Sequence, residues 1–145
     1  MRIVVLAILL ASLAISACSD DGGSGSEPTA VATTTVFKEL PTAWPADFPV
    51  FADATFDSAT LEANGTLTAT FRTAATTAQV NTFYDGALAT GPWFGKSSSE
   101  GGLTLWPIVN RTVGRGGSIT VSKNATTGGT DIVVYLLGFR TVAIE

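Results

Sequence analysis

The sequence predicts an α+β domain in which a single antiparallel β-sheet carries one amphipathic helix on one face, in the order ββαββββ. The first observation is that residues 76–90 have the apolar spacing of a helix. The second is that the segments on either side alternate in polarity or form short apolar runs between glycine-rich turns. Most connections are too short for the crossover that two parallel strands require, so we expect antiparallel pairing.

Residues 54–73 are predicted to form a β-hairpin, because apolar and polar residues alternate on either side of the turn signal Asn64-Gly65. A two-residue turn would mix polar and apolar side chains on one face. A three-residue loop instead pairs Leu61 with Leu67. Because the buried face of a hairpin decides its register, we predict the longer loop.

The predicted helix over residues 76–90 has signals at both ends. Thr76-Thr77-Ala78-Gln79 matches a capping box, and Gly91-Pro92 is typical of a helix stop. Its apolar stripe consists of Val80, Phe83, Tyr84, Ala87 and Leu88. We expect Phe83 and Tyr84 to lie in the core and not to stack on a ligand.

Four more strands are expected after the helix. They cover about 93–98, 103–108, 117–122 and 131–137, with glycine pairs or clusters between them. The tail over 139–144 is apolar enough to dock on the domain.

A proline-rich segment over residues 36–53, which we call the strap, precedes the hairpin. Its prolines at 41, 45 and 49 make a continuous helix unfavourable. Its aromatic residues, among them Trp44, Phe48 and Phe51, are too apolar to be left in water. We therefore expect the strap to be laid across a single domain that covers 36–145.

Alternation along the strands at 103–108 and 131–137 predicts apolar side chains on both faces of the sheet, and a single helix covers only one. Two interpretations of the second face remain open. In the first, the strap covers it, together with the tail around Val142 and Ile144. In the second, Trp106 and Tyr135 stay partly exposed and form the contact surface for a protein or glycan partner, because aromatic residues suit such anchors.

The first eighteen residues predict export. Arg2 precedes an apolar run over 3–15, which is too short to span a membrane, and small residues lead to Cys18. The motif Ile15-Ser16-Ala17-Cys18 resembles the lipobox of bacterial lipoproteins. The resemblance implies that residues 1–17 are a cleaved signal peptide and that Cys18 is lipidated, with a diacylglyceryl thioether and usually an amide-linked acyl chain such as palmitate. The alternative is an ordinary cleaved signal beside a coincidental cysteine.

Residues 18–35 follow as the lipidated cysteine and a polar tether, which is rich in glycine, serine and threonine. A tether of this length has an end-to-end distance of roughly 20–25 Å. A sorting signal in Ser19-Asp20-Asp21 is the alternative to a plain spacer. We expect the protein to be anchored to the cell membrane or the outer membrane, on the extracytoplasmic side.

Composition excludes several classes of function. The 145-residue chain has no histidine and one cysteine, so catalysis by Ser-His-Asp or Cys-His groups and zinc sites built on these residues are excluded. The formal net charge is −4 and the basic residues do not cluster, which makes nucleic acid an unsuitable partner. No cofactor or metal is expected.

The entry segment from Leu40 to Ala54 looks like that of many small, uncharacterised bacterial lipoproteins, in which a hairpin, a helix with Phe-Tyr and a Gly-x-Trp turn follow. The similarity extends over about residues 40–137 and carries no known catalytic residues. We therefore expect a non-catalytic binding or interaction module, with a structural subunit of the cell envelope as the alternative. A carboxylate-based hydrolase is a third reading, for which Asp47, Asp53, Asp57, Asp85 and Asp131 are the candidate acids.

Overall fold

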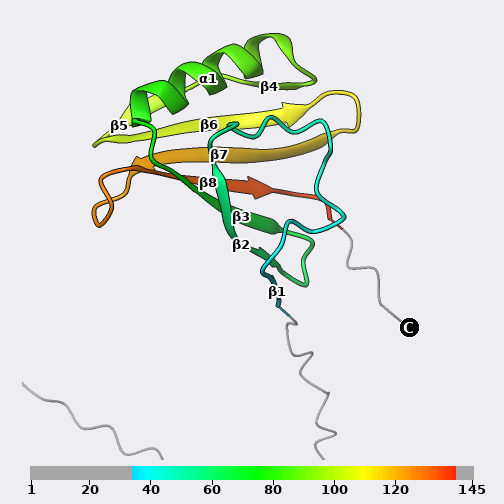
Figure 1. The fold of residues 1–145 in the computed structure, drawn as a ribbon. Coiled ribbons are helices and arrows are strands. Elements are labelled where there is room, and N and C mark those ends of the chain that lie inside the picture. The colour runs from blue at the N-terminus through cyan, green and yellow to red at the C-terminus, as the bar shows by residue number, and fades with distance from the viewer. Residues whose placement is uncertain (1–33, 140–145) are drawn as a thin grey trace, which may run out of the picture. The chain divides into compact units, whose positions relative to one another are not determined.

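The computed structural model describes residues 34–139, where eight strands form one antiparallel sheet and a single helix packs against it (Figure 1). The helix α1 covers Thr77–Thr90. The strands are β1 (Thr35–Phe37), β2 (Thr55–Leu61), β3 (Leu67–Thr73), β4 (Trp93–Gly95), β5 (Ser98–Glu100), β6 (Leu103–Asn110), β7 (Arg115–Lys123) and β8 (Thr130–Leu136). Their order in the sheet is β1-β2-β3-β8-β7-β6-β4, and β5 also pairs with β6. The predicted α+β class is confirmed.

The predicted order ββαββββ is incomplete in two places. The start of the strap forms β1 and extends the sheet beside β2. The single strand expected over 93–98 is two short strands, β4 and β5, which pair with β6 in one continuous register. The break between them falls opposite Pro107, whose carbonyl oxygen lies against Gly95. Proline lacks the N–H that would bond on that side, so the ladder is interrupted there.

The predicted three-residue hairpin loop is confirmed. Leu61 lies opposite Leu67, and a 2.9 Å hydrogen bond from the Glu62 N–H to the Thr66 carbonyl closes the loop. Gly65 adopts φ +82°, a conformation that favours glycine. Its carbonyl accepts a 2.9 Å hydrogen bond from the N–H of Phe139, so the loop also holds the segment that follows β8.

The helix begins as predicted. Thr76 caps it, and the reciprocal bonds of a capping box join Thr76 and Gln79. Val80, Tyr84 and Leu88 are buried, whereas Phe83 is only half-buried and packs edge-on against Phe51 of the strap at 5.4 Å. Phe83 therefore lies at the border of the core.

The strap lies on the same face of the sheet as the helix. Trp44 packs on Phe71 at 5.7 Å, and Phe48 packs on Trp93 at 5.1 Å. Trp93 lies opposite Asn110, which shares its face of β6 with the residues under the helix. The expectation that the strap covers the second face is therefore wrong. The helix is too narrow to cover the whole face of the sheet on which it packs. The aromatic residues of the strap cover the rest of that face.

The two ends of the sheet differ in what they hold. At one end the chain enters β1 at Thr35, the 62–66 turn joins β2 to β3, the 111–114 loop joins β6 to β7, and β8 finishes at Leu136. We call this the entry end. The opposite end, which we call the far end, holds the 124–129 loop between β7 and β8 (Figure 1).

Candidate interaction surface

The face of the sheet opposite the helix and the strap is not covered by any segment of residues 34–139, and we call it the open face. Its residues follow from strand alternation and from the pairing register, since antiparallel partners share a face. Its apolar members are Val36, Phe94, Leu103, Leu105, Pro107, Val109, Val133, Tyr135 and Leu137. Six of these are exposed large apolar side chains, namely Val36, Phe94, Leu103, Val109, Tyr135 and Leu137.

Tyr135 lies on the open face, and 39% of it is exposed. It stands opposite Ser118 on β7 and Thr68 on β3, so its nearest cross-strand neighbours are small side chains with hydroxyl groups. The position that the sequence predicts for Tyr135 is thus available to a partner.

Trp106 does not belong to this surface, and the expectation that it stays exposed is wrong. It is 0% exposed and lies under α1, where its indole Nε1 donates a 2.9 Å hydrogen bond to Asp85 Oδ1 and its ring packs on Tyr84. The alternating pattern of β6 correctly places Trp106 and Leu105 on opposite faces of the sheet. The expectation failed because the helix covers the face on which Trp106 lies.

The open face changes character along the strands. Nearest the entry end lie Phe94, Val109 and Leu137, which are apolar and exposed. The middle rows mix threonine and serine with single apolar residues such as Leu105 and Val133. At the far end the row has one apolar residue, Leu103, and is otherwise polar and charged: Glu100, Ser122, Asp131, Arg72 and Thr55.

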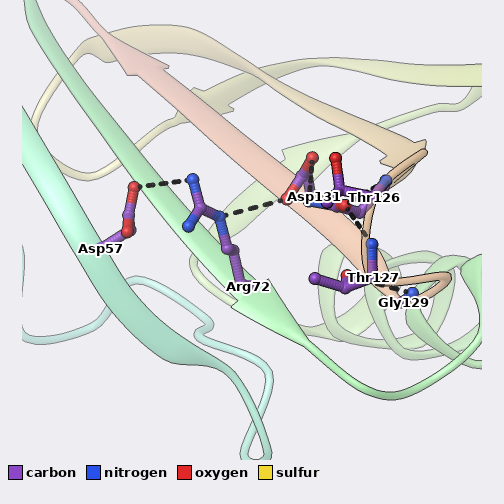
Figure 2. A network of polar contacts seen from close by, with 7 residues as sticks. Asp57, Arg72, Thr126, Thr127, Gly129 and Asp131 are labelled. Atoms are coloured by element: carbon purple, nitrogen blue, oxygen red, sulfur yellow. Dashed lines mark hydrogen bonds and ion pairs between the residues drawn. The ribbon is translucent and has the colours of Figure 1, made fainter.

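A network of charged and polar side chains organises the far end (Figure 2). Arg72 lies between Asp57, at 3.2 Å, and Asp131, at 3.6 Å. The amide of Asn124 donates to both carboxylate oxygens of Asp131, at 2.9 and 3.0 Å. The side-chain oxygen of Asn124 accepts from the N–H groups of Thr126 and Thr127, which fixes the 124–129 loop. Asp57 reaches Arg72 from a β-bulge in β2, and the sequence carries no signal for that bulge.

A pocket of about 540 Å³ lies beside this network. Its lining consists of Asp53, Thr55, Arg72, Thr73, Ala74, Thr127, Gly128 and Gly129. A hydrolase of the predicted kind needs two carboxylates that converge on one cleft. Among the described residues that line this pocket, Asp53 is the one carboxylate.

The remaining candidate acids each have another contact. Asp47 accepts a hydrogen bond from Asn110, Asp85 accepts one from Trp106, and Asp57 and Asp131 contact Arg72. The five aspartates are therefore spread over the domain. Within residues 34–139 no group of three or more acidic, histidine or cysteine side chains is placed to hold a metal ion.

Burial governs the titration of one tyrosine. Tyr84 is buried under the helix, and this burial raises the pKa of its phenol well above the ordinary value of 10.0. A hydrogen bond with the backbone of Phe51 opposes the effect in part. Tyr84 is therefore a neutral core residue that touches the strap.

Cys18 and the other residues before position 34 lie outside the described residues, as do Val142 and Ile144 of the tail. In the part of the chain that is described, no helix has both the length and the apolar character needed to cross a membrane. Comparisons with models of protein families, with curated proteins and with solved structures found no match. The features of this chain that bear on its function are therefore the N-terminal sequence and the open face.

Proposed function

We propose that this protein is a membrane-anchored, extracytoplasmic lipoprotein that acts as a non-catalytic interaction module. Cys18 carries the lipid anchor, and the open face with Tyr135 contacts a protein or glycan partner in the cell envelope. The observation that carries the proposal is the open face itself. It presents exposed large apolar side chains on a hydrogen-bonded sheet, and no segment among residues 34–139 covers them.

The anchor explains why such a face is useful at a membrane. One acyl chain holds a protein only marginally, whereas two or three chains on Cys18 give stable attachment. Attachment confines the domain to a thin layer above the lipid and raises its effective concentration toward partners in the same envelope. A weak contact surface then suffices for a lasting interaction.

The chemistry of the open face suits recognition. Patches of exposed apolar residues that are rimmed by polar groups are typical of interaction sites. Tyr135 offers a large ring with a hydroxyl at its edge, and the surrounding serine and threonine hydroxyls can donate or accept hydrogen bonds. These side chains come from paired strands, so little backbone conformational freedom is lost on binding.

Site-specific photo-cross-linking in intact cells tests the proposal. A photo-reactive phenylalanine analogue replaces Tyr135 in one strain and Ala89, an exposed position on α1, in a matched control strain. We expect a discrete cross-linked species from position 135 and none from position 89. Equal cross-linking from both positions, or none from position 135, would contradict the open face as the contact surface. If the protein is instead a structural subunit of the cell envelope, nearly all of its copies should appear in the cross-linked species.

A further inference from the structure

We propose that the entry end of the domain lies against the bilayer and that it recognises an anionic lipid surface. The contact is made by the entry-end patch, which we define as Phe94, Val109, Arg111, Val113, Arg115 and Leu137. This inference rests on the proposed lipid anchor at Cys18. Beyond the anchor, the inference states how the domain is oriented on the membrane and which charge the lipid headgroups carry.

The apolar part of the entry-end patch is exposed. Val113 stands in the 111–114 loop with 63% of its surface open, and 44% of Phe94 and 46% of Leu137 are exposed. Val109 joins these residues because it pairs with Phe94 across the β4–β6 ladder. Apolar side chains presented in this way can enter the boundary between headgroups and acyl chains.

Two guanidinium groups lie at the same end of the sheet as these side chains. Only Arg111 lies against them, because Arg115 pairs with Asn110 and therefore lies on the helix face beside the buried Phe139. Arg111 lies over the ring of Phe94 at 4.4 Å, and Arg115 lies over the ring of Phe139 at 4.3 Å. Arginine side chains pack their stems on apolar surface and keep the charge at a wet boundary. The guanidinium groups can then pair with lipid phosphates while the apolar side chains go deeper.

The loop that carries Val113 is already formed. The side-chain oxygen of Asn110 accepts hydrogen bonds from the N–H groups of Thr112, at 2.9 Å, and Val113, at 3.3 Å. The amide of the same residue donates to Asp47 at 2.7 Å, which ties the loop to the strap. Because the loop is held in place before contact, insertion costs little conformational freedom.

The path of the chain places this end near the membrane. Cys18 precedes Thr35 by seventeen residues, and a polar tether of that length, as the sequence predicts here, would have an end-to-end distance of roughly 20–25 Å. Thr35 starts β1 at the entry end, on the same side as the 111–114 loop (Figure 1). A nine-residue strand such as β7 extends about 30 Å, so the far end lies well beyond the screening length of about 8–10 Å.

Charge favours the same orientation. Glu100, Asp57 and Asp131 belong to the far end, where Arg72 lies between the last two carboxylates and Lys123 is a second cation. An anionic surface repels that end. At the entry end the carboxylates of Glu62 and Asp47 accept hydrogen bonds from the neutral amides of Asn64 and Asn110 and keep their charge. Arg111 and Arg115 oppose them there, so this end is less acidic than the far end.

Depth measurements on the lipidated chain test the inference. Cys18 is the only cysteine and is consumed by the anchor, so one engineered cysteine reports one site. A fluorophore at Val113→Cys is compared with one at Thr126→Cys in the far-end loop, in vesicles of phosphatidylglycerol and phosphatidylcholine that contain a brominated quencher lipid. We expect several-fold stronger quenching at position 113. Equal quenching at the two positions, or stronger quenching at position 126, overturns the proposal.

A matched pair of charge variants tests the lipid preference. In the Val113→Cys background, Arg111→Gln removes a cation from the entry-end patch, and Lys123→Gln removes one from an exposed site near the far end. We expect Arg111→Gln alone to reduce the quenching at least twofold. Equal effects of the two variants overturn the role of the patch.

The two proposals fail separately. Mass spectrometry of the purified protein reports whether Cys18 is acylated, independently of any quenching. An acylated protein with no preferential quenching at position 113 removes this inference and leaves the anchor. If Cys18 is not acylated, the Cys18→Ser, Val113→Cys chain is added to the vesicles from solution. Selective binding to anionic vesicles then supports the inference, and no binding overturns it.

Discussion

The indole Nε1 of Trp106, in the middle of β6, donates a 2.9 Å hydrogen bond to the Oδ1 atom of Asp85 on α1. This bond joins the helix to the sheet and satisfies the polar atom of a side chain that is otherwise sealed in the core. Trp106 is thus a structural residue, and Tyr135 alone of the two aromatic residues singled out from the sequence is accessible.

Truncation of these two aromatic residues should change the stability by very different amounts. Trp106→Ala leaves a large cavity and an unpaired carboxylate, and we expect it to lower the free energy of unfolding by about 3–5 kcal/mol. Tyr135→Ala changes a partly exposed position, and we expect an effect within about 0.5 kcal/mol. Urea melts followed by circular dichroism measure both values. Similar losses for the two variants would show that the faces of the sheet have been exchanged.

Two glycines offer a matched pair of alanine substitutions. A Cβ atom at Gly65 would collide with the carbonyl of Phe139 at a backbone φ of +82°, so Gly65→Ala should cost more than about 1 kcal/mol. Gly86 lies on the exposed side of α1 with open space around it, so Gly86→Ala should add about 0.5–1 kcal/mol. Thermal melts give the sign of each change. A stabilising Gly65→Ala would contradict the contact between the hairpin loop and the end of β8.

The strap is part of the core, and its truncation should behave accordingly. Phe48 is buried between Trp44 and Trp93, so Phe48→Ala should cost about 3–5 kcal/mol. Leu40 is an exposed strap residue, and Leu40→Ala should have an effect within about 0.5 kcal/mol. Deletion of residues 36–51 should therefore produce a dye-binding, poorly folded protein because it opens the helix face. A deletion variant with an unchanged melt would refute this placement of the strap.

Burial of Tyr84 predicts a decline in stability at alkaline pH. Its folded-state pKa lies above the ordinary value of 10.0, so the folded protein retains the phenol proton when the unfolded chain has lost it. The stabilisation is complete below pH 10 and falls by about 1.4 kcal/mol per pH unit above it. The difference between wild type and Tyr84→Phe in urea melts from pH 8 to 11.5 isolates this contribution. A difference that does not change with pH would contradict a neutral, buried Tyr84.

Local features of the fold could be predicted from the sequence because their causes are local. The hairpin loop follows from Asn64-Gly65 and the pairing of Leu61 with Leu67, and the helix start follows from the capping box at Thr76. The break between β4 and β5 could not be predicted in the same way. Its cause is Pro107, which acts from a neighbouring strand.

The candidate site could be predicted only in part. Alternation places Val133, Tyr135 and Leu137 on one face and Trp106 on the opposite face from Leu105, and the structure agrees. Alternation does not say which face the helix and the strap cover. That choice depends on contacts such as those between the strap and Trp93, which join residues far apart in the chain. The apolar row at the entry end could have been found from the sequence, because the alternation along residues 103–108 continues to Val109.

Both the proposed function and the orientation of the domain depend on attachment at Cys18, and one measurement tests that attachment most directly. The protein is purified from membranes with detergent, and the mass of its N-terminal peptide is determined. We predict a peptide that begins at Cys18 and carries two or three acyl chains. A peptide with unmodified Cys18, or one that begins at another residue, would contradict the account.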